Sequence, residues 1–184
     1  MSAARIGLLT GPVGVGKTTV AERVVGLALR RGLVCAGLLA PAMVNGCGQK
    51  AGIWGMDVRT GERRILARAD RDLGGPSIGP YSFDQAALDW AVTLIEHALC
   101  PPPQWACDLL VVDEIGKLEL WQGVGLAPLL PRLAAGAVSR SLVLVRDSLL
   151  AELQARLQPV EQMVFGVSEA NRRSLASLIL ETLL

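Results

Sequence analysis

The sequence lacks any apolar run that could cross a membrane. Charged residues or prolines interrupt each run before the roughly 18 residues that a spanning helix needs. Its first residues also lack a basic stretch followed by an apolar core, so we expect no secretory signal. The chain is nevertheless 51% hydrophobic and only 19% charged. This excess indicates a sheet covered on both faces, and we expect a cytoplasmic protein without a membrane partner.

An excess of one charge sign is missing as well. The 184 residues include 18 Lys and Arg against 17 Asp and Glu, which gives a net charge of +1. This balance gives no reason to expect nucleic acid or an acidic membrane surface as a partner. Repeats and low-complexity tracts are also lacking. We therefore expect residues 1–184 to form a single domain, and we favour a monomer.

Histidine and cysteine are too few, and wrongly spaced, for a zinc or redox site. The only histidine is His97, on an expected amphipathic helix, where a structural or solvated role is favoured over catalysis. No C-x-x-C pair is present. Two of the cysteines lie in or beside apolar strands, where cysteine packs as a small hydrophobe, so we expect free thiols. The cysteines are Cys35, Cys47, Cys100 and Cys107.

Glycine, by contrast, is concentrated near the start in a segment that matches G-x-x-x-x-G-K-[ST] at every defined position. With few Cβ atoms, such a loop can turn its backbone N–H groups inward around a chain of phosphates. Lys17 would reach the β- and γ-phosphates, and the Thr18 hydroxyl would ligate Mg²⁺. The expected nucleotide-binding residues here are Gly11, Pro12, Val13, Gly14, Val15, Gly16, Lys17, Thr18 and Thr19.

The segments around this loop support the same interpretation. An apolar strand is expected over residues 5–10 and a helix over residues 19–29. Strand, loop and helix in this order point a helix N-terminus, with its partial positive charge, at an anion. The sequence therefore predicts a nucleoside triphosphate as the ligand.

A second chemical element follows the continuous apolar run 109–112, which has the character of a central parallel strand. The run ends in Asp113 and Glu114. Asp113 would hold the magnesium together with Thr18, directly or through a water. Glu114 would orient or deprotonate a water that attacks the γ-phosphate. Alone, acids at a strand end often only solubilise the edge, but together with the glycine-rich loop they predict a hydrolytic site.

Strand-like and helical segments alternate along the chain, as in an α/β fold. We expect a P-loop NTPase three-layer sandwich, with a mostly parallel sheet and an inserted β-hairpin that turns at residues 59–62. Residues 69–82 are expected to be irregular. The expected strands are 5–10, 33–40, 51–58, 64–67, 109–112, 141–145 and 163–167.

The helix boundaries are predicted from capping residues. Asp84 can cap a helix that ends at the prolines 101–103, and Ser168 can cap a final helix over residues 169–183.

The string from Val112 to Glu119 reads V-D-E-I-G-K-L-E. On this string the chain resembles the nucleoside-triphosphatases of the THEP1 type, a family with a human cancer-related relative. The glycine-rich loop, the hairpin 52–66 and the segment 167–172 are similar too, so the resemblance covers most of the chain. It implies slow, Mg²⁺-dependent hydrolysis of ATP, GTP and other nucleoside triphosphates, with low base selectivity. It also implies that Asp113, Glu114 and Gly116 contact the nucleotide, with Glu114 and Lys17 catalytic.

The chain departs from the family pattern where cations are expected. The family's P-E-V-R is replaced by residues 41–44, P-A-M-V, and its R-V-G-K-Y by residues 77–81, S-I-G-P-Y. Such cations stabilise transition-state charge, so their loss bears on turnover more than on binding. Lys50 follows the first of these segments. Arg146, at the end of a parallel strand, is a better replacement than the hairpin arginines, for which solvent exposure is favoured. Those are Arg63, Arg64, Arg68 and Arg71.

Two further functions fit the same glycine-rich loop. A P-loop kinase would add an acceptor pocket and an arginine-bearing lid, for which residues 63–71 are a candidate. A nucleotide-binding module would bind but barely turn over. Glu114 beside Asp113 favours water as the nucleophile. Neither an N-K-x-D guanine motif nor an ABC-type signature occurs, which argues against those two classes of nucleotide-binding protein.

Overall fold

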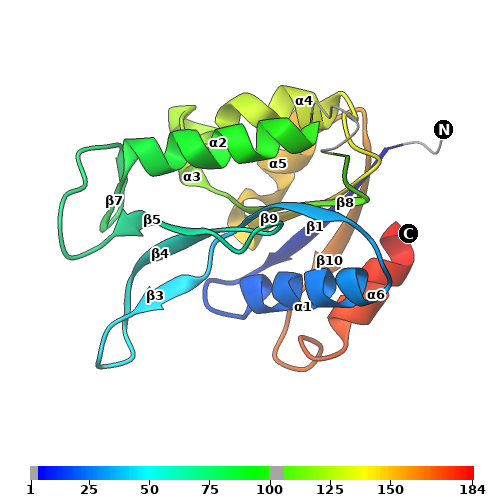
Figure 1. The fold of residues 1–184 in the computed structure, drawn as a ribbon, viewed down its shortest axis with the longest axis horizontal. Coiled ribbons are helices and arrows are strands. Elements are labelled where there is room, and N and C mark those ends of the chain that lie inside the picture. Colours follow the sequence, from blue (N-terminus) through cyan, green and yellow to red (C-terminus); the bar gives the residue numbers. More distant parts are fainter. Residues whose placement is uncertain (1–3, 100–105) are drawn as a thin grey trace.

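The computed structural model describes residues 4–99 and 106–184, and these form one mixed sheet between two helical layers (Figure 1). The parallel part consists, in spatial order, of β10 (Glu161–Gly166), β1 (Arg5–Gly11), β9 (Arg140–Arg146), β8 (Leu109–Ile115) and β2 (Cys35–Leu39). The antiparallel part continues from β2 with β4 (Lys50–Asp57), β5 (Arg63–Arg68), β7 (Tyr81–Phe83) and β6 (Ser77–Ile78). A further short strand, β3 (Ala42–Val44), pairs with β4.

Helices cover both faces of the sheet, as the apolar composition predicts (Figure 1). One face carries α1 (Lys17–Arg30) and α6 (Leu175–Leu183). The other carries α2 (Gln85–Leu99), α3 (Lys117–Gln122), α4 (Leu130–Ala134) and α5 (Leu150–Arg156), with short 3₁₀ turns η2 (Ala127–Leu129) and η3 (Asp147–Leu149) before α4 and α5.

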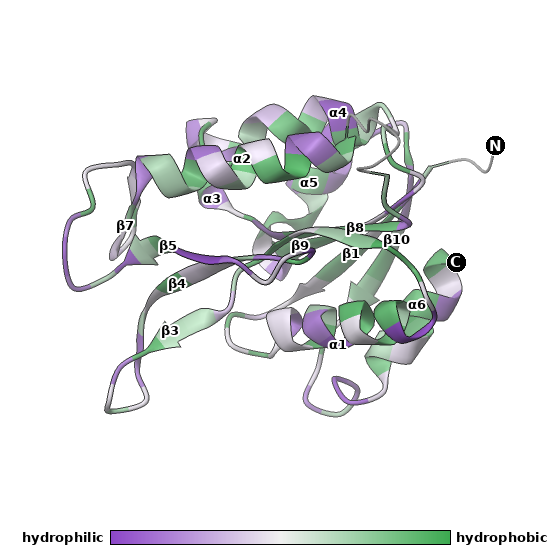
Figure 2. Ribbon diagram, in the orientation of Figure 1, coloured by the Kyte–Doolittle hydropathy of each residue, from purple (hydrophilic) through white to green (hydrophobic). Residues whose placement is uncertain are grey.

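The strand alternation divides the core in two. On β1, Ile6 and Leu8 pack under α2 and α5, whereas Leu9 packs under α1 and α6. Both faces of the inner strands β1, β8 and β9 are apolar, because their buried residues are divided between the two cores. Figure 2 shows hydrophobic colour along β8. Truncating a fully buried side chain such as Leu144 to alanine would cost about 2–5 kcal/mol. This rigid core holds the carboxyl ends of the parallel strands at one edge.

The inserted hairpin extends beyond that edge. β4 runs antiparallel to β2, with Leu39 opposite Met56, so the start of β4 at Lys50 lies past the carboxyl end of β2. In Figure 1, β3 and β4 accordingly extend beyond the end of α1 that follows the glycine-rich loop. We call β3, β4, β5, β6 and β7 the overhanging ribbon.

The expected fold class is confirmed, and so is the hairpin between β4 and β5. Asp84 caps α2 as predicted, because its Oδ1 accepts the Ala87 N–H at 2.7 Å. The segment 69–82, expected to be irregular, contains the short strand β6 and the start of β7, neither of which was predicted. The prolines expected to end α2 lie outside the described residues.

The predicted start of the last helix was wrong. α6 begins at Leu175, and residues 169–174 form turns. The Asn171 side chain accepts the Ser168 N–H at 2.8 Å and donates to the Gly166 carbonyl at 2.8 Å. These local hydrogen bonds compete with helix formation, so Ser168 initiates a turn instead.

Among the described residues, no helix is long and apolar enough to span a membrane. Cys35, Cys47 and Cys107 are free thiols, as expected, while Cys100 lies outside the described residues. Burial raises the pKa of both Cys35 and Cys107 to about 11, which disfavours the reactive thiolate. His97 lies in the last turn of α2.

Candidate nucleotide-binding site

The glycine-rich loop joins the end of β1 to the start of α1. Gly14 and Gly16 have φ values of 80° and 104°, a region that side-chain-bearing residues rarely adopt. Gly16 also occupies the N-cap position of α1, so the first N–H groups of the helix open toward the loop. The loop therefore presents backbone donors and a helix dipole to an anion at the carboxyl edge of the sheet.

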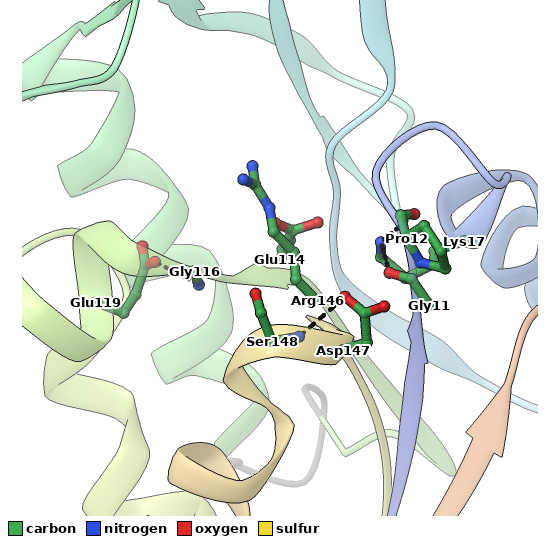
Figure 3. A network of polar contacts seen from close by, with 9 residues as sticks. All are labelled: Gly11, Pro12, Lys17, Glu114, Gly116, Glu119, Arg146, Asp147 and Ser148. Atoms are coloured by element: carbon green, nitrogen blue, oxygen red, sulfur yellow. Dashed lines mark hydrogen bonds and ion pairs between the residues drawn. The ribbon is translucent and has the colours of Figure 1, made fainter.

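Lys17 lies inside this loop (Figure 3). Its Nζ donates to the carbonyl oxygens of Gly11 at 2.8 Å and Pro12 at 3.1 Å, and the residue is 6% exposed. Desolvation lowers the Lys17 pKa, while the nearby Glu114 carboxylate acts in the opposite direction. The ammonium is thus held where a phosphate chain would pass through the loop.

Asp113 is buried directly beside Thr18. Its Oδ2 accepts the Ala40 N–H at 3.0 Å, and it also accepts a hydrogen bond from the Thr18 side chain. Desolvation raises the Asp113 pKa to about 6, although both hydrogen bonds act to lower it. A buried carboxylate of this kind is stabilised by a cation.

The donor set at this point fits a hard divalent cation. Thr18 and Asp113 offer only oxygen atoms, which Mg²⁺ prefers. No group of three or more His, Cys, Asp or Glu side chains suited to a metal occurs among residues 4–99 and 106–184. The remaining ligands of a cation here would therefore come from water and phosphate, as is usual for Mg²⁺ at nucleotide sites.

Glu114 forms an ion pair with Arg146. Arg146 Nε lies 2.8 Å from Glu114 Oε1, and the two side chains are 37% and 26% exposed (Figure 3). In the β1–β9 register Arg146 stands opposite Gly11, so this arginine flanks the start of the glycine-rich loop. The ion pair places one cation and one acid beside the loop where the phosphates are expected.

Two of the hairpin arginines have partners other than the acids of the site. Arg64 pairs with Glu62 at 2.8 Å and lies over the Trp90 ring at 4.8 Å. Arg68 Nε donates to Asp70 at 2.7 Å. Arg146, by contrast, contacts an acid of the site, Glu114.

The segment after Glu114 is held by a buried acid. Glu119 Oε2 accepts the Gly116 N–H at 2.8 Å, and its Oε1 accepts the Leu126 N–H at 3.3 Å. Burial raises the Glu119 pKa, and these N–H groups oppose that shift. Because the Gly116 N–H is already used, a contact between Gly116 and nucleotide stays a prediction.

The other predicted residues of the glycine-rich loop are mostly on its solvent-exposed side. Pro12 and Val13 are exposed, Val15 is partly buried, and Thr19 is exposed on the first turn of α1. Together, the structure brings the side chains of Lys17, Thr18, Asp113 and Glu114 to one edge of the sheet. Their roles with nucleotide stay predictions.

Lys50 is not among the site residues predicted from the sequence. Lys50 interacts electrostatically with Glu114, Arg146, Asp113 and Lys17, although it belongs to β4 of the inserted ribbon. Its Nζ lies 5.1 Å from the centre of the Tyr81 ring. The one sequence signal for Lys50 is its place shortly after residues 41–44, where the family pattern has an arginine that this chain lacks.

A glycine-rich loop between β1 and α1, with acids at the end of the neighbouring parallel strand β8, defines an α/β protein of the P-loop class. The chain belongs to the NTPase family, whose sequence profile matches residues 7–180. The resemblance expected from the V-D-E-I-G-K-L-E string is thereby confirmed.

Relatives of this chain include proteins named nucleoside-triphosphatase THEP1. The one from Methanopyrus kandleri is 30% identical over 181 residues, which cover 96% of this chain and 94% of the relative. Those from Caldivirga maquilingensis and Ignicoccus hospitalis are 33% and 35% identical over 112 residues. These two matches cover 61% of this chain and 59% of each relative.

Two solved structures share the fold. The crystal structure of THEP1 from Aquifex aeolicus has a TM-score of 0.76 at 19% identity, covering 97% of this chain and 98% of the other. The solution structure of a human cancer-related nucleoside triphosphatase has a TM-score of 0.71 at 25% identity, covering 97% of both chains. The overhanging ribbon and the parallel sheet thus belong to an arrangement found in relatives.

Proposed function

We propose that this protein, as a single domain, is a Mg²⁺-dependent nucleoside-triphosphatase that hydrolyses ATP, GTP and other nucleoside triphosphates to the diphosphate and phosphate. The observation that carries the proposal is the convergence of Lys17, Thr18, Asp113 and Glu114 at the carboxyl edge of the sheet. Family membership and the names of the relatives support the same activity.

Binding would rest on the glycine-rich loop. Its backbone N–H groups and the α1 N-terminus would attract the phosphates, and the Lys17 ammonium would exchange its carbonyl partners for β- and γ-phosphate oxygens. Thr18 and Asp113 would hold Mg²⁺, which when bound neutralises phosphate charge.

The chemistry would rest on Glu114. Its carboxylate accepts a proton from a water whose oxygen bonds to the γ-phosphorus, while the bond from that phosphorus to the β–γ bridging oxygen breaks and leaves the diphosphate. Arg146, held against Glu114 at 2.8 Å, orients that carboxylate and adds positive charge near the transferring group.

Low base selectivity belongs to the proposal because no guanine-reading N-K-x-D motif occurs and the relatives are named without a particular base. We further propose that the protein works as a cytoplasmic monomer. The free thiols of Cys35, Cys47 and Cys107 support a reducing compartment.

Phosphate release from ATP, GTP, CTP and UTP, measured with and without Mg²⁺, tests the proposal. We expect release from all four nucleotides, dependent on Mg²⁺ and abolished in Lys17→Ala. Release that needs an added acceptor would indicate a kinase instead. Tight nucleotide binding without release would indicate a binding module.

A further inference from the structure

The overhanging ribbon brings a cation to the open side of the phosphate site. β4 begins at Lys50, opposite Val44 of β3, and continues to Met56 opposite Leu39. Ala40, the residue after the carboxyl end of β2, donates its N–H to Asp113. Lys50 therefore projects from the part of β4 that extends beyond the acids at the end of β8.

The ammonium of Lys50 is positioned by an aromatic ring from the same ribbon. Nζ lies 5.1 Å from the centre of the Tyr81 ring, on β7, which is within the range of a cation–π interaction. Tyr81 is partly buried and also lines a cavity of about 480 Å³ formed by residues 69–82. The ring thus limits where the long lysine side chain can lie.

The charges around Lys50 are those of the phosphate site. Its electrostatic neighbours are the acids Glu114 and Asp113 and the cations Arg146 and Lys17. Desolvation lowers the Lys50 pKa, and the Glu114 carboxylate acts in the opposite direction, although the residue as a whole is exposed. The ribbon arginines Arg64 and Arg68, by contrast, are paired with acids of the ribbon itself.

We propose that Lys50 is a phosphate-contacting residue that binds the γ-phosphate of the nucleoside triphosphate from the overhanging ribbon, with the Tyr81 ring guiding its ammonium. This proposal rests on the proposed function and adds a second lysine to the triphosphate site. Lys50 takes no part in bond breaking or proton transfer. Its charge stabilises the γ-phosphoryl oxygens as the bond to the bridging oxygen breaks.

Affinities for a nucleoside diphosphate and for a non-hydrolysable triphosphate analogue, measured with Mg²⁺ for each variant, test this assignment. Lys50→Ala should weaken analogue binding about 10-fold or more and leave diphosphate affinity within about two-fold, because only the γ-phosphate loses a charged partner. Turnover should fall about 10- to 10²-fold. Lys50→Arg should restore most of both losses.

Tyr81 variants test the guiding ring. Tyr81→Phe should behave as the wild type, while Tyr81→Leu should lose a few-fold in analogue affinity, since an exposed cation–π contact is worth about 0.5–1 kcal/mol. Arg64→Gln is the matched control, because it removes another ribbon cation over an aromatic ring, and it should change neither affinity.

Equal weakening of diphosphate and analogue binding by Lys50→Ala, or no change in either, would overturn the assignment. Failure of the proposed function has a different signature. In that case the wild type would release no phosphate at all, whereas the difference between analogue and diphosphate binding would still report on Lys50.

Discussion

Arg146 on β9 and Glu114 on β8 form a 2.8 Å ion pair that bridges neighbouring parallel strands at the edge where the phosphates are expected. This pair links the proposed base to the start of the glycine-rich loop, because Arg146 lies opposite Gly11 in the sheet. Since both side chains are partly exposed, the pair contributes at most about 1 kcal/mol to folding. We therefore expect the ion pair to affect turnover more than stability.

Arg146→Gln should lower kcat about 10-fold or more while nucleotide affinity changes only a few-fold, because a neutral amide orients Glu114 weakly and adds no charge. In the double variant with Glu114→Gln, the fold reduction in kcat should be smaller than the product of the reductions in the two single variants, because both residues act on one step. Steady-state kinetics of the two single variants and the double variant measure this. If the kcat losses of the two single variants simply multiply in the double variant, Arg146 does not act through Glu114.

Glu114→Gln should reduce turnover about 10²-fold or more and keep nucleotide affinity within a few-fold. The amide preserves the shape of the side chain but cannot accept the proton from water. Phosphate release under saturating nucleotide, together with a binding titration, checks both parts. A variant that turns over at the wild-type rate would remove Glu114 from the mechanism.

Lys17→Ala should weaken both binding and turnover. The ammonium is the buried cation of the loop, and its removal takes away the positive charge expected at the phosphates and the donor to the Gly11 and Pro12 carbonyls. Titration with a fluorescent nucleotide and phosphate release measure the two effects. Full activity in this variant would reject the phosphate-cradle assignment.

Glu119→Ala should destabilise the fold by about 2–4 kcal/mol, because it leaves the Gly116 and Leu126 N–H groups inside the protein without their acceptor. Glu119→Gln should cost less, since an amide oxygen replaces one of the two acceptors. Urea unfolding of both variants gives the free energies. Stability equal to the wild type in Glu119→Ala would show that these hydrogen bonds contribute nothing.

Local elements of this chain could be predicted from sequence because the signals and the structures are both local. The loop between β1 and α1 is specified by its glycines, and the start of α2 by the Asp84 side chain three residues before Ala87. The acids at the end of β8 were predicted together with the loop because parallel strands place their carboxyl ends at one edge.

Elements that depend on distant partners, or on a local hydrogen bond that competes with a helix, were missed or misplaced. β3, β6 and β7 are two or three residues long and exist only through pairing within the ribbon. Ser168 has the chemistry of a helix cap, but Asn171 engages its backbone in a turn. Lys50 is remote in sequence from the site to which we assign it, and only the antiparallel course of β4 relates the two.

The most direct measurement is a crystal structure of the protein with Mg²⁺ and a non-hydrolysable nucleoside triphosphate analogue. The β- and γ-phosphates should lie within the loop of residues 11–18, with Lys17 bound to their oxygens, Mg²⁺ at Thr18 and Asp113, and Glu114 facing the γ-phosphorus. An analogue bound elsewhere, with that loop empty or filled by side chains, would contradict the account.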